Sequence, residues 1–128
     1  AAASMVSENK VYAHPASVDS IPSSANQEDV VSMGTTAARK AGMIVQNTLS
    51  VLAMELLTAC QAIDIRRRLN THGQGITPLH EALYQHVREK VAFFEIDREI
   101  WPDIAEVEKM VRSGELLEIV KEYMPEFQ

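Results

Sequence analysis

The feature that most constrains this sequence is a long apolar pattern with helical period between residues 32 and 68. Its apolar positions alternate spacings of four and three, as in the heptad repeat of helices that pack side by side. The members of this seam are Val45, Leu49, Leu52, Leu56, Ala59 and Ile63. Other faces are apolar too, because only Glu55 and Asp64 are formally charged between Met43 and Ile65. The pattern predicts a helix that is nearly buried all round.

A small domain cannot cover a helix of this length. At about 1.5 Å per residue the helix extends about 50 Å, whereas a compact domain of 128 residues is roughly 36 Å across. The first residues, Ala1-Ala2-Ala3-Ser4, also lack a start methionine and a cap, which is typical of the interior of a helix. We therefore expect a piece of a larger, oligomeric helical protein.

A membrane span and a nucleic-acid-binding protein are two alternatives that the sequence disfavours. Polar side chains interrupt the long apolar segment: Gln46, Asn47, Thr48, Ser50, Glu55, Thr58 and Gln61. A charge at the middle of a bilayer costs about 2.5–3.5 kcal/mol, so we expect no membrane partner. The net charge of −6 has the wrong sign for binding phosphates, so we expect no nucleic-acid partner either.

Shorter helices are expected after the long one. Thr77-Pro78 combines an N-cap with a proline at the first helical position, and Pro102-Asp103 begins a further helix that Gly114 ends. A last short helix precedes Pro125. One face of the helix after Pro78 carries Leu79, Leu83, Val87, Val91 and Phe94. Because no alternating strand pattern is present, the expected fold class is all-α, with a long central bundle helix plus shorter helices.

The histidines and the cysteine give no pattern of a metal or redox site. His80 and His86 are six residues apart, on roughly opposite sides of a helix, and cannot share an ion. His14 and His72 fall in loops without a ligand-spaced partner, so we expect no metal. The single Cys60 cannot form an internal disulfide, which favours a reducing, cytoplasmic location and an inert buried thiol.

The segment from His14 to Asp29 has no helical period and is expected to form a long ordered loop. Its end, residues 23–29, concentrates amides and carboxylates immediately before the long helix. From the residues alone, an acidic cluster that caps this helix is the simpler interpretation, and a binding site is the other.

The loop also carries a resemblance to a known family. Residues 14–24, then Asn26-Gln27-Glu28-Asp29, then residues 31–34 closely resemble the C-terminal part of histidine ammonia-lyases, which are aromatic amino acid lyases. The similarity covers most of the chain and is strongest over residues 1–66. It implies the C-terminal part of a larger, mostly helical homotetrameric lyase. The implied regions are the end of a helix (1–10), an active-site loop (11–31), a long bundle helix (32–68) and a segment of short helices (77–128).

The resemblance implies an activity that this chain cannot perform by itself. Histidine ammonia-lyases eliminate ammonia from L-histidine to give urocanate, in histidine degradation, with a methylidene-imidazolone group formed from an internal Ala-Ser-Gly. No Ala-Ser-Gly is present, since Ala3-Ser4 precedes Met5 and Ala16-Ser17 precedes Val18. The implied partners are therefore L-histidine, the rest of the parent lyase chain and further copies in a homo-oligomer, and the isolated chain is expected to be inactive.

One active-site position carries over directly from the family. Glu28 matches the glutamate that faces the substrate imidazole, as a catalytic and substrate-binding residue. Gln27 and Asn26 match its neighbours, and of these we expect Gln27 to bind substrate as well. A carboxylate there can hydrogen-bond the ring and favour its protonated form, which makes the β-proton easier to remove. It can alternatively accept a proton itself.

Val30 departs from the pattern, because histidine lyases usually have histidine there. Residues 30–35 look more like tyrosine and phenylalanine ammonia-lyases and aminomutases, although those typically have glutamine in place of Glu28. Such an enzyme is one alternative function. A non-enzymatic helical module that binds a partner through the long helix is the other.

Overall fold

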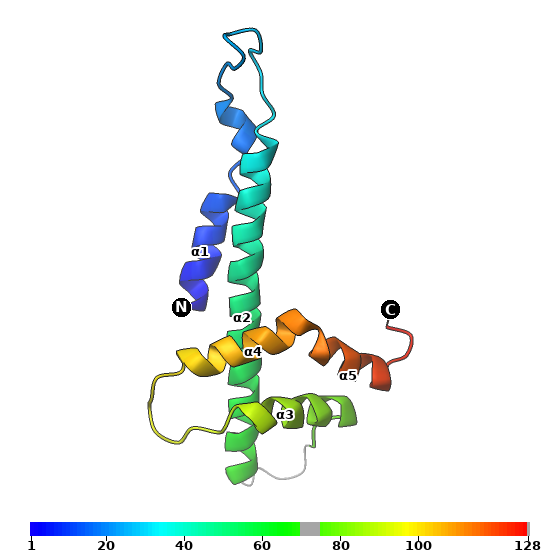
Figure 1. The fold of residues 1–128 in the computed structure, drawn as a ribbon. Helices are drawn as coiled ribbons and strands as arrows, with labels where there is room; N and C mark the ends of the chain where they lie inside the picture. Colours follow the sequence, from blue (N-terminus) through cyan, green and yellow to red (C-terminus); the bar gives the residue numbers. More distant parts are fainter. Residues whose placement is uncertain (70–74, 128) are drawn as a thin grey trace. The chain divides into compact units, whose positions relative to one another are not determined.

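The computed structural model describes residues 1–69 and 75–127, and within them all regular elements are helices apart from one isolated β-bridge (Figure 1). The elements are α1 (Ala2–Tyr12), the 3-10 helix η1 (Ala16–Asp19), α2 (Gly34–Arg68), α3 (Pro78–Lys90), α4 (Trp101–Ser113) and α5 (Glu115–Tyr123). The all-α prediction is confirmed. His72 lies outside the described residues.

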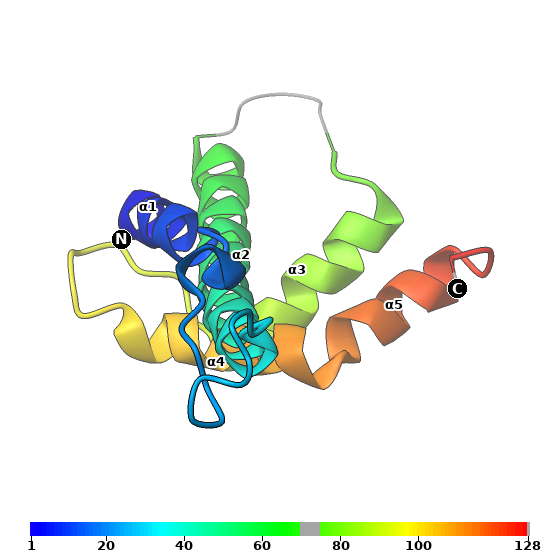
Figure 2. The same ribbon diagram turned by 90° about the horizontal axis from the view of Figure 1, so that it is seen from above.

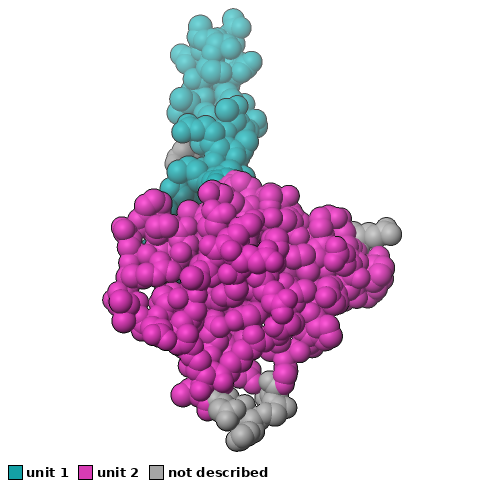
Figure 3. All heavy atoms as spheres, turned by 60° about the horizontal axis from the view of Figure 1, so that its bottom comes forward, with its two compact units in different colours: residues 1–48 teal, residues 49–128 magenta. Residues whose placement is uncertain are grey.

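The chain divides into two compact units, Ala1–Thr48 and Leu49–Gln128, which Figure 3 distinguishes by colour. Helix α2 is continuous and contributes its first part to unit 1 and its second part to unit 2. Unit 1 holds α1, η1 and the loop that follows. Unit 2 holds α3, α4 and α5.

Helix α2 begins two residues later than the sequence pattern predicts. Met33 has a left-handed backbone, with φ of 51°, so the right-handed helix cannot include it, and Gly34 is the first helical residue. At the other end, Arg66, Arg67 and Arg68 occupy the last turn, where cations complement the helix dipole. Arg67 also pairs with Glu81, and Arg68 pairs with Glu95.

The core of unit 2 uses only one side of α2. Seven fully buried side chains form it: Ala53, Leu57 and Cys60 of α2, Val87 of α3, the following Val91, and Val107 and Met110 of α4. No member of the heptad seam is buried, and Val45 and Leu52 are 54% and 44% exposed. Burial of α2 all round is therefore not reached within this chain, as the length of the helix predicts, because the other helices supply apolar partners to one side only.

By length and apolar composition, α2 would pass as a membrane-spanning helix, and it alone does so among the described helices. A core helix of a water-soluble protein has the same two properties. Two polar side chains of the helix, Asn47 and Gln61, donate hydrogen bonds to protein acceptors.

Helix α3 starts where the sequence predicts and ends earlier. The Thr77 hydroxyl accepts a hydrogen bond from the His80 backbone N–H, and Pro78 takes the first helical position. The helix ends at Lys90, so Val91 and Phe94 do not continue its apolar face. Side-chain bonds hold this stretch, because Arg88 donates to the Val91 carbonyl at 3.0 Å and Gln61 donates to the Phe94 carbonyl at 2.7 Å.

A polar cluster joins α2 to α3 beside the core. Arg88 and Asp64 form an ion pair with side chains only 12% and 14% exposed, and the Tyr84 hydroxyl donates to the same carboxylate. Burial and this hydrogen bond raise the pKa of Tyr84. Burial also raises the pKa of the Cys60 thiol. The expected burial of Cys60 is confirmed, and a protonated buried thiol is unreactive.

Gly114 separates α4 from α5, and the two helices follow one another with a bend (Figure 2). Its φ of 83° is left-handed, a conformation that only glycine adopts at little cost. The predicted end of the helix at Gly114 is confirmed.

Two alanine substitutions at glycine should have opposite effects on stability. Neither glycine has another atom within 4 Å of an added Cβ, so backbone conformation decides the outcome. Gly114→Ala should lower the free energy of unfolding by about 1–2 kcal/mol, because alanine resists a left-handed φ. Gly42→Ala, inside α2, should raise it by about 0.5–1 kcal/mol. Urea unfolding followed by circular dichroism measures both values, and equal effects would contradict this interpretation.

Candidate functional site

Side chains of α2 anchor α1 and the residues that join it to η1, just before the loop that leads to α2. Lys40 donates a hydrogen bond to the carbonyl of His14, at the end of α1. Asn47 donates to Glu8 and to Asn9, both at 2.9 Å, which fixes α1 alongside the first part of α2 (Figure 1). All five residues belong to unit 1, so these contacts hold α1 and His14 against the first part of α2 within that unit.

Ser20 closes the loop further along. Its hydroxyl accepts a hydrogen bond from the Val31 backbone N–H at 2.7 Å and donates to the Val31 carbonyl at 3.1 Å. One side chain thus satisfies both backbone groups of a residue eleven positions away. The residues between Ser20 and Val31 therefore form a closed loop.

The tip of this loop is a small hairpin. Ser23 and Glu28 form the isolated β-bridge, with backbone N–H···O distances of 3.0 and 3.3 Å. Between them, Ser24, Ala25 and Asn26 have φ values of 53°, 55° and 68°. A left-handed backbone at a residue other than glycine costs on the order of 1–3 kcal/mol, and such strain concentrates at functional sites. The hairpin is therefore the candidate site of this chain.

Glu28 presents a carboxylate from the base of the hairpin. The Ser23 hydroxyl donates to its Oε2 at 3.0 Å. Across residues 1–69 and 75–127, no ion pair involves Glu28 and no hydrogen bond reaches its Oε1. The side chain is exposed, as is that of the adjacent Gln27, whose backbone N–H bonds the Ser24 carbonyl.

The alternative in which this acidic cluster caps α2 is wrong. The first turn of α2 contains no acidic residue, and Glu28 lies six positions before Gly34, paired with Ser23. The carboxylate is therefore available for another group. With one oxygen held and the other open, it can accept a hydrogen bond from a ring N–H and stabilise a cationic ring.

The chain's own residues do not fit the prosthetic group implied by the resemblance. The Ala-Ser pairs lie in helices, Ala3-Ser4 in α1 and Ala16-Ser17 in η1, and neither is followed by glycine. No group of metal-ligating side chains occurs in the described part of the chain. His80 and His86 have local partners instead, with Thr77 Oγ1 at 2.7 Å from His80 Nδ1 and Glu115 Oε2 at 3.3 Å from His86 Nε2.

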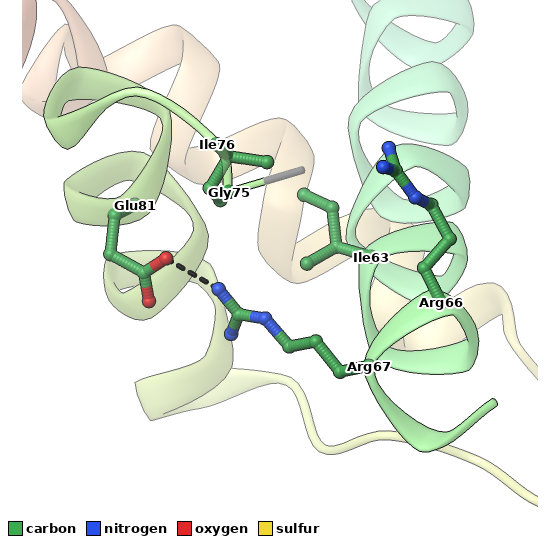
Figure 4. A pocket seen from close by; sticks show the side chains of 6 residues that line it. All are labelled: Ile63, Arg66, Arg67, Gly75, Ile76 and Glu81. Carbon is green, nitrogen blue, oxygen red and sulfur yellow. Dashed lines mark hydrogen bonds and ion pairs between the residues drawn. The ribbon is translucent and has the colours of Figure 1, made fainter. Parts of the chain in front are cut away.

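A hollow of about 240 Å³ in unit 2 is a second place to look for a site. It lies between the end of α2 and the start of α3, lined by Ile63, Arg66, Arg67, Gly75, Ile76 and Glu81 (Figure 4). Arg67 extends across it to the Glu81 carboxylate. The guanidinium that would bind an anion there thus already has an anionic partner.

Sequence reasoning did not find the groups that hold Glu28. Ser23 bonds Glu28 across five positions, and Ser20 closes the surrounding loop onto Val31 across eleven. The usual hairpin signal, an Asn-Gly or Asp-Gly pair, is absent from the loop. The one usable signal is Asn26, since asparagine tolerates a left-handed backbone better than most residues.

Removing the Ser20 hydroxyl should loosen the hairpin without unfolding the chain. Ser20→Ala leaves both backbone groups of Val31 without their partner, which costs about 1–2 kcal/mol of local stability. Hydrogen exchange at the Val31 and Glu28 amides should accelerate about tenfold. Ser17→Ala is the control, because this exposed hydroxyl has no hydrogen-bond partner within the described chain. Unchanged exchange in Ser20→Ala would contradict the closing role of Ser20.

Known proteins resemble the chain in sequence and in structure. The sequence model of the aromatic amino acid lyases matches residues 1–89. A histidine ammonia-lyase of Caldanaerobacter subterraneus is 54% identical over 121 residues, which cover 94% of this chain and 23% of that protein. A histidine ammonia-lyase of Symbiobacterium thermophilum is 53% identical over 120 residues, with the same coverage.

Solved structures give the same result. The crystal structure of a histidine ammonia-lyase from Trypanosoma cruzi superposes with a TM-score of 0.84 at 48% identity, covering 94% of this chain and 23% of the other. A tyrosine aminomutase from Streptomyces globisporus gives 0.82 at 37% identity, covering 94% and 22%. The chain thus spans about a quarter of the length of the relatives that it matches. It belongs to the aromatic amino acid lyase family.

Proposed function

We propose that this chain is the C-terminal part of a histidine ammonia-lyase, which eliminates ammonia from L-histidine to give urocanate. The observation that carries the proposal is the carboxylate of Glu28, held by Ser23 through one oxygen and open at the other. It stands on a strained hairpin, in a loop that the Ser20 hydroxyl closes onto Val31. The names of the most similar relatives support the same substrate.

In the proposed reaction, Glu28 binds the imidazole of the substrate. Its open oxygen accepts a hydrogen bond from a ring N–H and stabilises the protonated ring. A cationic ring withdraws electrons from the side chain, so the proton on the β-carbon is removed more easily. The second possible role of Glu28 is to accept that proton itself. Gln27, beside it, is the proposed further substrate contact.

The charge of Glu28 favours histidine over phenylalanine. Beside a phenyl ring the carboxylate would be a desolvated charge without a hydrogen-bond donor, at a cost of several kcal/mol. A tyrosine hydroxyl could donate to it, so a tyrosine lyase or aminomutase is the second candidate. That candidate is favoured by Val30, which departs from the histidine-lyase pattern, and by the likeness to a tyrosine aminomutase.

The proposed enzyme requires groups that these 128 residues do not contain. We propose that another part of a longer lyase chain supplies the methylidene-imidazolone from its Ala-Ser-Gly, and that further copies in a homotetramer cover the exposed seam of α2. A reducing, cytoplasmic compartment belongs to the proposal because Cys60 is a free thiol. The competing proposal, a helical interaction module, requires a start codon just before Ala1, whereas the lyase requires an upstream reading frame encoding Ala-Ser-Gly.

A chimeric enzyme tests the function directly. This chain replaces the matching quarter of the Caldanaerobacter subterraneus relative, with which it shares 54% identity. The chimera should convert histidine to urocanate, followed by ultraviolet absorbance. The isolated 128-residue chain should form none, since it contains no Ala-Ser-Gly.

Glu28→Gln in this chimera should lower histidine turnover by at least about a hundredfold, because the amide cannot stabilise a cationic ring or accept a proton. Any turnover of phenylalanine should change little or improve. Asp29→Asn is the matched control, because it removes the same charge from the exposed neighbouring residue and should leave turnover within about twofold. Steady-state rates on histidine, tyrosine and phenylalanine provide the comparison. Undiminished histidine turnover in Glu28→Gln would remove the main support for the substrate.

A further inference from the structure

We infer that Ser23 is a positioning residue, whose hydroxyl fixes the Glu28 carboxylate in the orientation that receives the substrate ring. This inference rests on the proposed function. Its basis is the hydrogen bond from Ser23 Oγ to Glu28 Oε2 at 3.0 Å, which joins two residues already paired through their backbones.

The hairpin explains why Ser23 can reach Glu28. Residues directly opposite each other across an antiparallel bridge place their side chains on the same side, with Cβ atoms about 4.5–5.5 Å apart. The backbone N–H of each residue bonds the carbonyl of the other, at 3.0 and 3.3 Å, so the two Cα positions are fixed relative to each other. A short hydroxyl side chain opposite a glutamate then meets the carboxylate without strain in either residue.

The hydrogen bond from Ser23 restricts the side-chain rotamers that an exposed glutamate otherwise samples. Glu28 is exposed, whereas Ser23 is half-buried, so the serine is the better-fixed partner of the two. A glutamate side chain without contacts samples many rotamers, and ordering it on substrate binding costs entropy. The Ser23 hydroxyl orders it beforehand and occupies Oε2, which leaves Oε1 to accept the ring N–H.

Two other serines provide matched comparisons. Ser17, in η1, and Ser24, at the hairpin tip, are exposed, and their hydroxyls have no hydrogen-bond partner among the residues that the structure describes. Ser17 is the better control, because its φ is not left-handed, whereas the φ of Ser24 is 53°. Ser17→Ala therefore makes the same chemical change in the same unit without touching Glu28.

A double-mutant cycle in the chimeric enzyme separates positioning from a general structural effect. Ser23→Ala should lower kcat/KM for histidine about tenfold, the scale of one lost hydrogen bond to a charged group. Ser23→Thr keeps the hydroxyl and should recover most of the loss, and Ser17→Ala should stay within about twofold of the unsubstituted chimera. When Glu28→Gln is already present, Ser23→Ala should cost less than about twofold, because the carboxylate that it orients is gone.

Two outcomes would overturn the inference while leaving the proposed function intact. One is an active chimera in which Ser23→Ala has no effect, and the other is an equal loss with and without Glu28→Gln. An unsubstituted chimera that forms no urocanate counts against the proposed function instead. The contact is then tested on the 128-residue chain by the ¹³C resonance of the Glu28 carboxyl, which should shift in Ser23→Ala and not in Ser17→Ala. An unshifted resonance would overturn the inference.

Discussion

The rest of the structure depends on α2, because the other helices of this chain cover only one side of its apolar surface. The core of unit 2 takes Ala53, Leu57 and Cys60 from one side of the helix and closes them with α3 and α4. No residue of the seam is part of the buried core, although Leu56 packs against it, and Val45 and Leu52 are about half exposed. Exposed apolar surface of this extent is typical of interfaces. The helix thus supports a small core on one side, and its exposed seam is the surface that we propose further copies cover.

The same helix supports the candidate site. Lys40 and Asn47, both on its first part, bond the end of α1 and the start of the loop, and Ser20 closes the loop onto Val31. The loop closed by Ser20 carries a hairpin whose three tip residues have left-handed backbones. A side chain on such a hairpin is held more firmly than its exposure alone indicates. A long helix with an anchored loop is therefore a physical means of fixing one carboxylate in place.

Local signals in the sequence were enough to predict most of the helices. The Thr77-Pro78 start of α3 and the end of α4 at Gly114 each follow from the chemistry of one or two residues, and both are confirmed. The end of α3 was not predictable in this way. Val91 and Phe94 keep a helical spacing in sequence, but bonds from Arg88 and Gln61 hold their carbonyls outside the helix. At this point side-chain contacts determine where the helix ends, and the spacing of the apolar residues does not.

From the sequence, Glu28 could be identified as a site residue only through the family resemblance, because an acidic residue shortly before a long helix also fits the role of a helix cap. In the structure Glu28 does not cap α2, because Met33 has a left-handed conformation and Glu28 is paired with Ser23. The hairpin itself was not predictable, since its left-handed residues Ser24 and Ala25 are types that rarely adopt that conformation. Exposure of the seam could not be predicted either, because it depends on which helices share the chain with α2.

The most direct test of the central claim, that α2 needs helices from outside this chain, is analytical ultracentrifugation of the 128-residue chain at tens of micromolar. We predict association in aqueous buffer. Leu52→Glu, on the seam, should abolish it, and Thr58→Glu, which adds the same charge to an exposed position off the seam, should not. A compact monomer that binds no hydrophobic dye would contradict the claim, as would a chain that partitions into lipid vesicles instead of associating with itself.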